Sequence, residues 1–294
     1  MKILGISGGM HSCGLAYLKD GKPEFAFEEE RFNRVRTYKD FYEDLFRFPY
    51  ECGQNVWYNK DFDWNKLDYI TSHYSAEVTE KIWDGIGLGP FPKEKFIKTN
   101  HHRAHCSLAY YCSGFEEDTL VVSIDAMGEK YSARYFIGSN GDLKDIGKIS
   151  NEFKSLGHYY AMLTEFLGFR RLKDEGKVVG TASHGHFFED FYNVFNKCVT
   201  IDGIKTDKDN GKVISGGIYE DFYKLWFEKF GSKFTCHVKN DIAYNGQLVF
   251  EEKVLEIFNN LHKKYPKIKK LALAGGIFAN VKLNKKINEL EWVD

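Results

Sequence analysis

The segment 119–129 reads Thr-Leu-Val-Val-Ser-Ile-Asp-Ala-Met-Gly-Glu, an apolar run that delivers a carboxylate and then a glycine. An apolar run of this length that ends in a glycine turn is typical of a buried strand. A second apolar stretch covers residues 131–138, and the turn Asn140-Gly141-Asp142 separates it from another that reaches residue 150. The sequence therefore predicts a strand meander that opens at residue 119.

Residues 2–30 show the same arrangement in different letters. An apolar run begins at Lys2 and reaches the glycine turn Gly8-Gly9, an alternating stretch covers 15–18, and the turn Asp20-Gly21-Lys22 leads into a run at 25–27. A repeat of architecture predicts two related lobes that face one another and hold a ligand between their glycine turns. We expect the first lobe to span residues 1–116 and the second to span 117–294.

The segments that connect and follow these meanders are predicted from their periodicity. We expect a short strand at residues 67–71, helices at 101–112, 157–168 and 250–264, a polar loop at 203–212, and a buried strand at 271–274. A helix should start at Ile277 after the turn Gly275-Gly276. The chain stops at Asp294, where a further strand is expected, so we expect the second lobe to lack its C-terminal portion.

The composition is that of an ordinary globular protein, with 43% hydrophobic and 28% charged residues. The 41 basic and 42 acidic side chains nearly cancel, so no global field attracts nucleic acid or an anionic membrane. The six cysteines are scattered without a CxxC pair, which favours reduced thiols in the cytoplasm. No stretch approaches the about 20 apolar residues that span a bilayer. We therefore expect a soluble, cytoplasmic protein with neither membrane nor nucleic acid as a partner.

His101 and His105 are the most diagnostic residues of the chain. They lie one helical turn apart, so their imidazoles project from one face of a helix and can ligate one ion, while His102 points elsewhere. Asp125, which follows the apolar run, could be a third ligand. Such a set suits divalent iron, manganese or zinc with positions left open for phosphate or water. Alternatively, histidines cap helices or fill polar interiors, and aspartate commonly caps a turn.

Three turns supply candidate nucleotide contacts, because glycine allows the backbone to approach a phosphate, a ribose or a base closely. The first turn offers backbone N–H groups without a Walker signature, since neither Gly-Lys-Ser/Thr nor a helix follows it. Tight packing of a strand on a helix explains the last turn equally well. The candidate cofactor-binding residues are Gly8, Gly9 and Ser12 in the first turn, Gly128 and Glu129 in the second, and Gly275, Gly276 and Asn280 in the third.

Further motifs occur in order along the chain. They are Phe27-Glu28-Glu29-Glu30-Arg31-Phe32, His101-His102-Arg103-Ala104-His105, Ser155-Leu156-Gly157 with Tyr160, Thr164-Glu165-Phe166-Leu167-Gly168-Phe169, Glu175-Gly176-Lys177-Val178-Val179-Gly180, and Gly275-Gly276 with Asn280, Leu283 and Asn284. With these motifs the chain resembles the carbamoyltransferase family of nodulation proteins and of enzymes that carbamoylate cephalosporin or tobramycin precursors. The resemblance runs through most of the chain and is more specific than any single motif.

This resemblance implies an α/β fold of the actin-like, sugar-kinase-like ATPase type, with duplicated ribonuclease H-like lobes. It also implies an O-carbamoyltransferase component. Its cofactors would be ATP and a divalent metal, which would be iron, manganese or magnesium. In similar enzymes carbamoyl phosphate and ATP form a carbamoyl-adenylate in a separate C-terminal domain, and the actin-like domain passes the carbamoyl group to a hydroxyl of a small-molecule acceptor. His101, His105 and Asp125 would then hold the metal that engages nucleotide or carbamoyl oxygens.

Two residues are candidates for a catalytic role under this resemblance. His11 would border the acceptor, and Lys177 would contact phosphate, although a single lysine in a helix is usually solvated surface. Ser12 stands where the family commonly has an acidic residue. The family continues beyond the position of Asp294 with a further metal-binding aspartate. We therefore expect that the missing C-terminal domain was excised or comes from a partner chain. We also expect the metal to be weakly held, partly occupied or absent in this 294-residue form.

Three other functions fit parts of the pattern. A tRNA threonylcarbamoyl transferase-like enzyme would need a basic surface for its polyanionic partner, which the balanced charge does not favour. A non-catalytic nucleotide-binding subunit that needs a partner chain fits the expectation of a missing C-terminal part. A sugar kinase of the same fold does not generally use a histidine pair with this spacing to bind metal.

Overall fold

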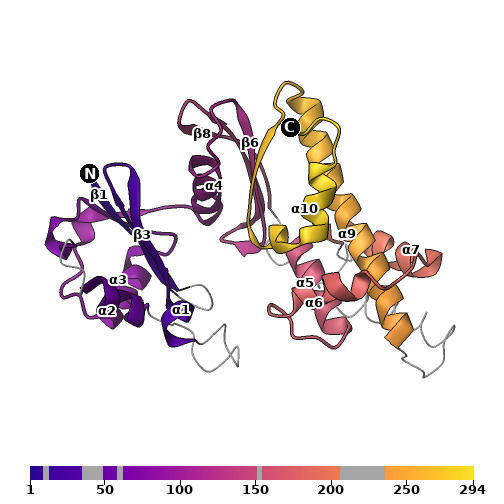
Figure 1. The fold of residues 1–294 in the computed structure, drawn as a ribbon, viewed down its shortest axis with the longest axis horizontal. Coiled ribbons are helices and arrows are strands. Elements are labelled where there is room, and N and C mark those ends of the chain that lie inside the picture. The colour runs from indigo at the N-terminus through magenta and orange to yellow at the C-terminus, as the bar shows by residue number, and fades with distance from the viewer. Residues whose placement is uncertain (9–12, 35–48, 58–61, 151–153, 206–235) are drawn as a thin grey trace. The chain divides into compact units, whose positions relative to one another are not determined.

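The computed structural model describes residues 1–8, 13–34, 49–57, 62–150, 154–205 and 236–294. The chain divides into two compact units, Met1–Asn100 and His101–Asp294 (Figure 1). The sequence places the boundary between its two lobes after residue 116 instead. The units divide earlier because the helix that follows Asn100 packs on the sheet of the second unit.

A five-stranded sheet with the order β3-β2-β1-β4-β5 organises the first unit. Its strands are β1 (Lys2–Ser7), β2 (Gly14–Lys19), β3 (Lys22–Glu28), β4 (Tyr69–Ser72) and β5 (Phe96–Lys98). The first three pair antiparallel, whereas β4 runs parallel to β1 and β5 runs parallel to β4. The strands expected near residues 2, 15, 25 and 67 are confirmed by this sheet.

Helices pack on this sheet around one buried cluster. Alternate residues of β1, Leu4 and Ile6, contribute to the cluster together with Trp83. The helical elements of the unit are α1 (Glu29–Asn33), α2 (Tyr50–Trp57), η1 (Trp64–Lys66), α3 (Ala76–Ile86) and η2 (Lys93–Lys95). Helix α2 lies in a segment for which the sequence shows no clear periodicity. Its N-terminus is capped from outside the segment, because the carboxylate of Glu29 accepts hydrogen bonds from the backbone N–H groups of Glu51 and Cys52.

The second unit is built on the same plan. Its four-stranded sheet has the order β11-β6-β7-β8, with strands β6 (Thr119–Gly128), β7 (Tyr131–Ser139), β8 (Asp142–Ile149) and β11 (Lys270–Ala274). The first three form an antiparallel meander, and β11 runs parallel to β6 on its other side. The repeated meander that the sequence predicts is confirmed, and in both units a parallel strand lies beside its first strand.

The same turn chemistry closes one hairpin in each unit. Asp20-Gly21 joins β2 to β3 and Asn140-Gly141 joins β7 to β8, and the four φ angles are 51°, 80°, 50° and 78°. Two-residue turns with both residues in the left-handed region match the twist of the paired strands, and Asp-Gly and Asn-Gly are the pairs that adopt them most readily. This explains why these letters locate the hairpins.

Helices cover both faces of the second sheet. On one face α4 (His101–Tyr111) packs against Val121 and Phe136. On the other face α5 (Leu156–Phe166) packs on β6, and α9 (Cys236–Lys264) packs on α5 within the buried cluster that contains Leu120 and Val122. Because β6 is buried on both faces, its residues form a continuous apolar run rather than an alternating one. The remaining elements are α6 (Glu175–Ala182), α7 (Glu189–Cys198), β9 (Val199–Thr200), β10 (Gly203–Ile204), η4 (Gly276–Ala279) and α10 (Val281–Asn288).

Two expectations for the second unit need correction. The polar loop expected at 203–212 begins with β10, which pairs with β9, and the part after residue 205 lies outside the described residues. The helix expected at 250–264 starts at Cys236 instead. The sequence misses its first half because buried polar residues interrupt the apolar pattern there. Among the residues that the structure describes, no helix combines the length and apolarity needed to cross a bilayer.

Candidate metal centre

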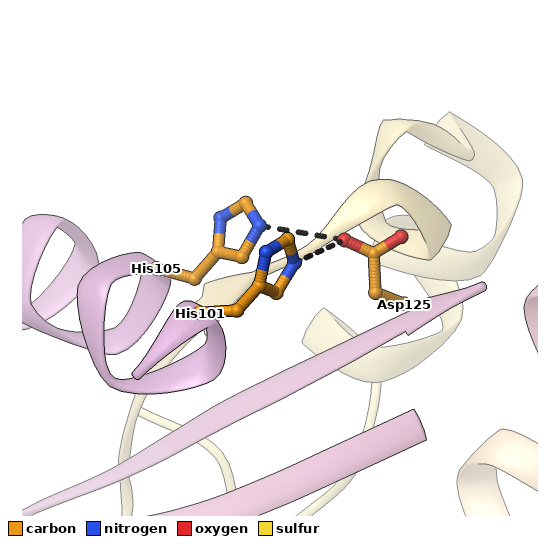
Figure 2. Close-up of side chains that lie close together, drawn as sticks. All are labelled: His101, His105 and Asp125. Carbon is orange, nitrogen blue, oxygen red and sulfur yellow. Dashed lines mark hydrogen bonds and ion pairs between the residues drawn. The ribbon is translucent and has the colours of Figure 1, made fainter. Parts of the chain in front are cut away.

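His101 and His105 lie on one face of α4 and converge on Asp125 (Figure 2). The Nε2 atom of His101 is 3.5 Å from Oδ2 of Asp125, and the Nε2 atom of His105 is 3.3 Å from the same oxygen. The ring centroids of the two histidines are 4.7 Å apart. Two imidazole nitrogens and one carboxylate oxygen therefore form a group that could hold a metal ion, as the sequence predicts.

The position of Asp125 follows from the alternation of β6. Val121, Ser123 and Asp125 are two residues apart, so all three point to the face that α4 covers. Ser123 contacts His102, and Asp125 contacts the other two histidines. Pairing with β7 shifts register between Ile124 and Gly128, which leaves Asp125 at the start of a β-bulge. Such bulges often re-aim side chains beside functional sites.

The carboxylate of Asp125 is stabilised in its ionised form. Burial by itself would raise its pKa, but hydrogen bonds from His101, His105 and the backbone N–H of Ala126 hold the pKa of Asp125 well below its ordinary value. The Ala126 N–H donates to Oδ1 at 2.7 Å, so Oδ2 is the oxygen that faces the histidines. A carboxylate that is ionised and turned toward two imidazoles has the chemistry of a divalent metal ligand.

His102 points away from this group, as its place in the helix predicts, and is fully buried. Its Nδ1 lies 2.8 Å from the hydroxyl of Ser123, and its Nε2 lies 2.9 Å from the carbonyl oxygen of Tyr131. The carbonyl can only accept, so Nε2 carries the proton and Nδ1 accepts from Ser123. Burial lowers the pKa of His102 to about 4. This neutral imidazole anchors the first turn of α4 to β6 and β7.

We call His101, His105 and Asp125 the metal group, because they could hold a metal ion. Three glycines allow other parts of the unit to approach this group closely. A Cβ atom on Gly128 would lie 2.6 Å from His101 Cδ2, and one on Gly157 would lie 2.6 Å from the backbone of Ala126. A Cβ atom on Gly276 would lie 3.0 Å from Oδ1 of Asp125. The structure thus brings two glycines of the predicted nucleotide contacts, Gly128 and Gly276, to the metal group. Their contact with nucleotide stays a prediction.

Helix α5 begins beside the same strand end. The hydroxyl of Ser155, its N-cap residue, donates to the carbonyl oxygen of Ala126 at 2.6 Å and accepts from the backbone N–H of His158 at 3.0 Å. Nδ1 of His158 lies 2.9 Å from the same carbonyl oxygen. The residue that follows Asp125 is therefore tied to α5 by two side chains. The Ser155-Leu156-Gly157 motif acquires a structural role at the metal group.

The other predicted site residues lie elsewhere. Gly9, His11 and Ser12 fall outside the described residues, and Gly8 in the first unit accepts a hydrogen bond from the Tyr74 hydroxyl. Glu129 is exposed in the turn between β6 and β7 with a φ angle of 64°. The Lys177 ammonium group lies 3.1 Å from Asp174 rather than beside the three metal-site residues.

Gly275 and Asn280 flank the glycine at the metal group. The φ angle of Gly275 is 96°, a left-handed value that favours glycine. The side chain of Asn280 is buried, caps α10 through the backbone N–H of Leu283, and pairs with Gln247. Sequence reasoning missed Gln247, which lies in the half of α9 that was not predicted as helix. Its polar side chain interrupts the apolar pattern of the helix, so no local signal marks it.

The sequence of this chain matches a known protein family over most of its length. Residues 70–291 match the family described as the carbamoyltransferase N-terminus. The chain belongs to that family. The resemblance drawn from the ordered motifs is therefore confirmed, and the matched span contains His101, His105, Asp125 and the turn at Gly276.

Two curated relatives of this carbamoyltransferase N-terminal chain are similar to it along nearly its whole length. An uncharacterized protein of Methanocaldococcus jannaschii is 30% identical over 294 residues, which cover 98% of this chain and 52% of the relative. The nodulation protein NolNO of Sinorhizobium fredii is 27% identical, with 98% of this chain and 46% of that protein covered. The chain spans about half the length of these two relatives.

A solved structure supports the fold assignment. Full-length HypF, crystallised in a phosphate- and nucleotide-bound form, aligns with 98% of this chain and 50% of its own at a TM-score of 0.57 and 14% sequence identity. At that identity the likeness concerns the fold alone. Together with the repeated sheet topology it confirms the predicted α/β class: the carbamoyltransferase N-terminal chain has the actin-like, sugar-kinase-like ATPase fold with duplicated lobes.

Proposed function

We propose that this chain is a component of an O-carbamoyltransferase that transfers a carbamoyl group to a hydroxyl of a small-molecule acceptor. The carbamoyl group would come from carbamoyl phosphate through an ATP-dependent carbamoyl-adenylate. Membership of the carbamoyltransferase N-terminus family supports the reaction class. The observation that carries the proposal is the convergence of His101, His105 and Asp125 beside a glycine turn.

The three residues fit a divalent cation in their chemistry. Imidazole nitrogen and carboxylate oxygen are ligands for iron, manganese and zinc, and a set of three protein ligands leaves positions open for substrate. A cation bound there would supply Lewis acidity to a phosphate or carbamoyl oxygen. Among the chain's own groups, Asp125 is held ionised and oriented by Ala126, and His102 fixes the helix that carries the two histidines.

The backbone around the metal group would orient the substrates. Gly128 and Gly276 lack a side chain where one would clash with His101 or Asp125, so their main chain packs directly on these two residues and would help to orient them. ATP is the nucleotide that we propose for this site, because the resemblance to the carbamoyltransferase family implies it. Transfer to the acceptor needs no protein nucleophile, since the acceptor hydroxyl would itself attack the carbamoyl carbon. Holding that hydroxyl in position would contribute to the rate. We expect the reaction in the cytoplasm, where scattered cysteines stay reduced.

A second candidate is a nucleotide-binding subunit that needs another polypeptide for turnover. The chain spans 52% and 46% of two curated relatives, so its activity is to be tested both alone and together with the remaining half. Under this proposal the step that forms the carbamoyl-adenylate belongs to the partner polypeptide. The chain itself would then bind nucleotide and metal without catalysing carbamoyl transfer alone.

Mass spectrometry of candidate acceptors tests both proposals. The chain is incubated with ATP, carbamoyl phosphate and hydroxyl-bearing metabolites, with and without a polypeptide equivalent to the remaining half of its relatives. A mass gain of one carbamoyl group that requires both polypeptides supports the transferase and assigns this chain the role of a component that does not turn over alone. Absence of any carbamoylated acceptor and of any adenylate in the combined mixture contradicts the transferase. Asp125→Asn in the combined mixture is the matched inactive variant.

A further inference from the structure

A buried polar network lies between α5, α9 and the end of η4. The amide network consists of Tyr160, Gln247, Glu251 and Asn280, whose exposed fractions are 5%, 1%, 5% and 7%. Oε1 of Gln247 accepts from the Tyr160 hydroxyl at 2.6 Å and from Nδ2 of Asn280 at 2.9 Å. Nε2 of Gln247 donates to Glu251 at 2.6 Å and to Asn280 at 3.1 Å.

Gln247 thereby uses its full hydrogen-bonding capacity, because a primary amide has two N–H donors and two acceptor lone pairs. Burying such a group is costly unless its partners are all in place, and a network that is fully satisfied fixes one arrangement of the elements that contribute to it. Packing alone would be served by an apolar side chain of similar volume. The polar network therefore specifies geometry at this position.

The geometry that it specifies is that of the glycine turn at the metal group. Asn280 ends the short helix η4, and Gly276 begins it. Gly276 packs against Oδ1 of Asp125, while Asn280 is held by Gln247 and by the backbone N–H of Leu283. A single short helical turn thus connects the amide network to the metal ligand.

The network also reaches Asp125 from the opposite direction. Tyr160 lies on α5, whose N-cap residue Ser155 donates to the carbonyl oxygen of Ala126. Through Tyr160, Gln247 contacts the helix that holds the residue after Asp125, and through Asn280 it contacts the turn that packs on the Asp125 carboxylate. Helix α5 and the Gly276 turn, which approach Asp125 from different sides, are therefore both hydrogen-bonded to the amide of Gln247.

We propose that Gln247 is a positioning residue for the metal site, and that it orients Asp125 by fixing the Gly276 turn relative to α5. The inference rests on the metal site of the proposed function. Residues outside the ligand set orient the ligands, and their loss commonly weakens metal binding on the order of tenfold or more. No contact between Gln247 and the metal is required for this role.

The same helix offers a matched control. Asn245 is fully buried. Its Nδ2 donates hydrogen bonds to the carbonyl oxygens of His186 and Asp241, and its Oδ1 accepts one from the backbone N–H of Phe188. It therefore resembles Gln247 in burial and in hydrogen bonding but supports the segment 186–188. If buried amides of α9 serve stability alone, variants of Asn245 and Gln247 will change the metal site equally.

The test is a titration of the metal-free chain with Co²⁺, read by visible absorption, with thermal unfolding measured in parallel. In Gln247→Met, which keeps side-chain volume, we expect the Co²⁺ dissociation constant to rise on the order of tenfold and the absorption bands to shift. Tyr160→Phe removes one hydroxyl and should give a smaller change in the same direction. Asn245→Leu should lower the melting temperature but leave the Co²⁺ affinity and bands unchanged.

Unchanged Co²⁺ affinity and bands in Gln247→Met overturn the inference, and so does an equal change in Asn245→Leu. If Gln247→Met does not fold, Tyr160→Phe decides, since shifted bands support the inference and unchanged bands overturn it. Failure of the metal site itself has a different signature, because Co²⁺ affinity would then be unaffected by His101→Ala. That result overturns the proposed site and this inference with it, whereas an effect of His101→Ala without one of Gln247→Met overturns the inference alone.

Discussion

Asp125 is ionised in surroundings that would otherwise oppose a charge. Burial raises the pKa of a carboxyl group, yet the two histidines and the Ala126 N–H lower the pKa of Asp125 well below its ordinary value. Its two oxygens are used differently, because Oδ1 accepts from Ala126 and lies against Gly276 while Oδ2 faces the histidines. At the scale of single residues, the site depends on what surrounds this carboxylate.

Gly276→Ala should disturb metal binding more than it disturbs folding. The added methyl would lie 3.0 Å from Oδ1 of Asp125, so the carboxylate or the turn would have to shift by a few tenths of an ångström. We expect the metal dissociation constant to rise on the order of tenfold, measured by calorimetric titration alongside the melting temperature. Gly180→Ala is the control, since a Cβ there meets nothing within 4 Å. Equal metal affinity in the two variants would contradict the proposed contact.

His102 predicts a loss of stability in acid. Its pKa is about 4 in the folded chain against 6.5 when unperturbed, so between these values the unfolded chain binds the proton more readily. The free energy of unfolding should therefore fall as pH drops below 6.5, by about 3 kcal/mol near pH 4, and stay constant on this account above pH 7. Urea unfolding at a series of pH values measures the slope. His102→Asn, which cannot titrate, should have a shallower slope, and an identical slope would refute the assignment.

At the scale of elements, the sequence predicts the parts whose signals are local. The alternation along β6 places Val121, Ser123 and Asp125 on one face, and helical spacing places His101 and His105 on one face of α4. Both patterns are visible in the amino-acid sequence alone, because each depends only on the spacing of neighbouring residues. The first half of α9 could not be predicted in this way, because buried Asn245 and Gln247 break its apolar pattern and each has partners more than 30 residues away in sequence.

The N-cap of α5 gives a prediction that belongs to this scale. Ser155→Ala removes the hydrogen bond to Ala126 and the N-cap of α5. The free energy of unfolding should therefore fall by about 1–2 kcal/mol, and metal affinity should fall as well. Ser75→Ala removes the N-cap of α3 in the first unit and is the matched control. Chemical denaturation and metal titration of both variants provide the comparison. Loss of metal affinity in Ser75→Ala would argue against a specific role for Ser155.

At the scale of the whole molecule, two units share one topology and one of them carries the candidate site. The repeat was predictable because glycine-containing turns and apolar strands recur in the same order, even though the letters differ. The approach of Gly276 to Asp125 was not predictable, since it depends on β11 pairing with β6 across more than half of the second unit. The likeness to HypF and the match to the carbamoyltransferase N-terminus agree with this topology.

His101, His105 and Asp125 are proposed to hold one divalent cation together. Equilibrium dialysis of the metal-free chain against Mn²⁺, Fe²⁺ or Zn²⁺, followed by elemental analysis, tests this proposal most directly. We predict one bound equivalent for the wild type and for His184→Ala, which alters an exposed histidine outside the group, and loss of that equivalent in His101→Ala and Asp125→Asn. Equal binding by all four proteins would contradict the account.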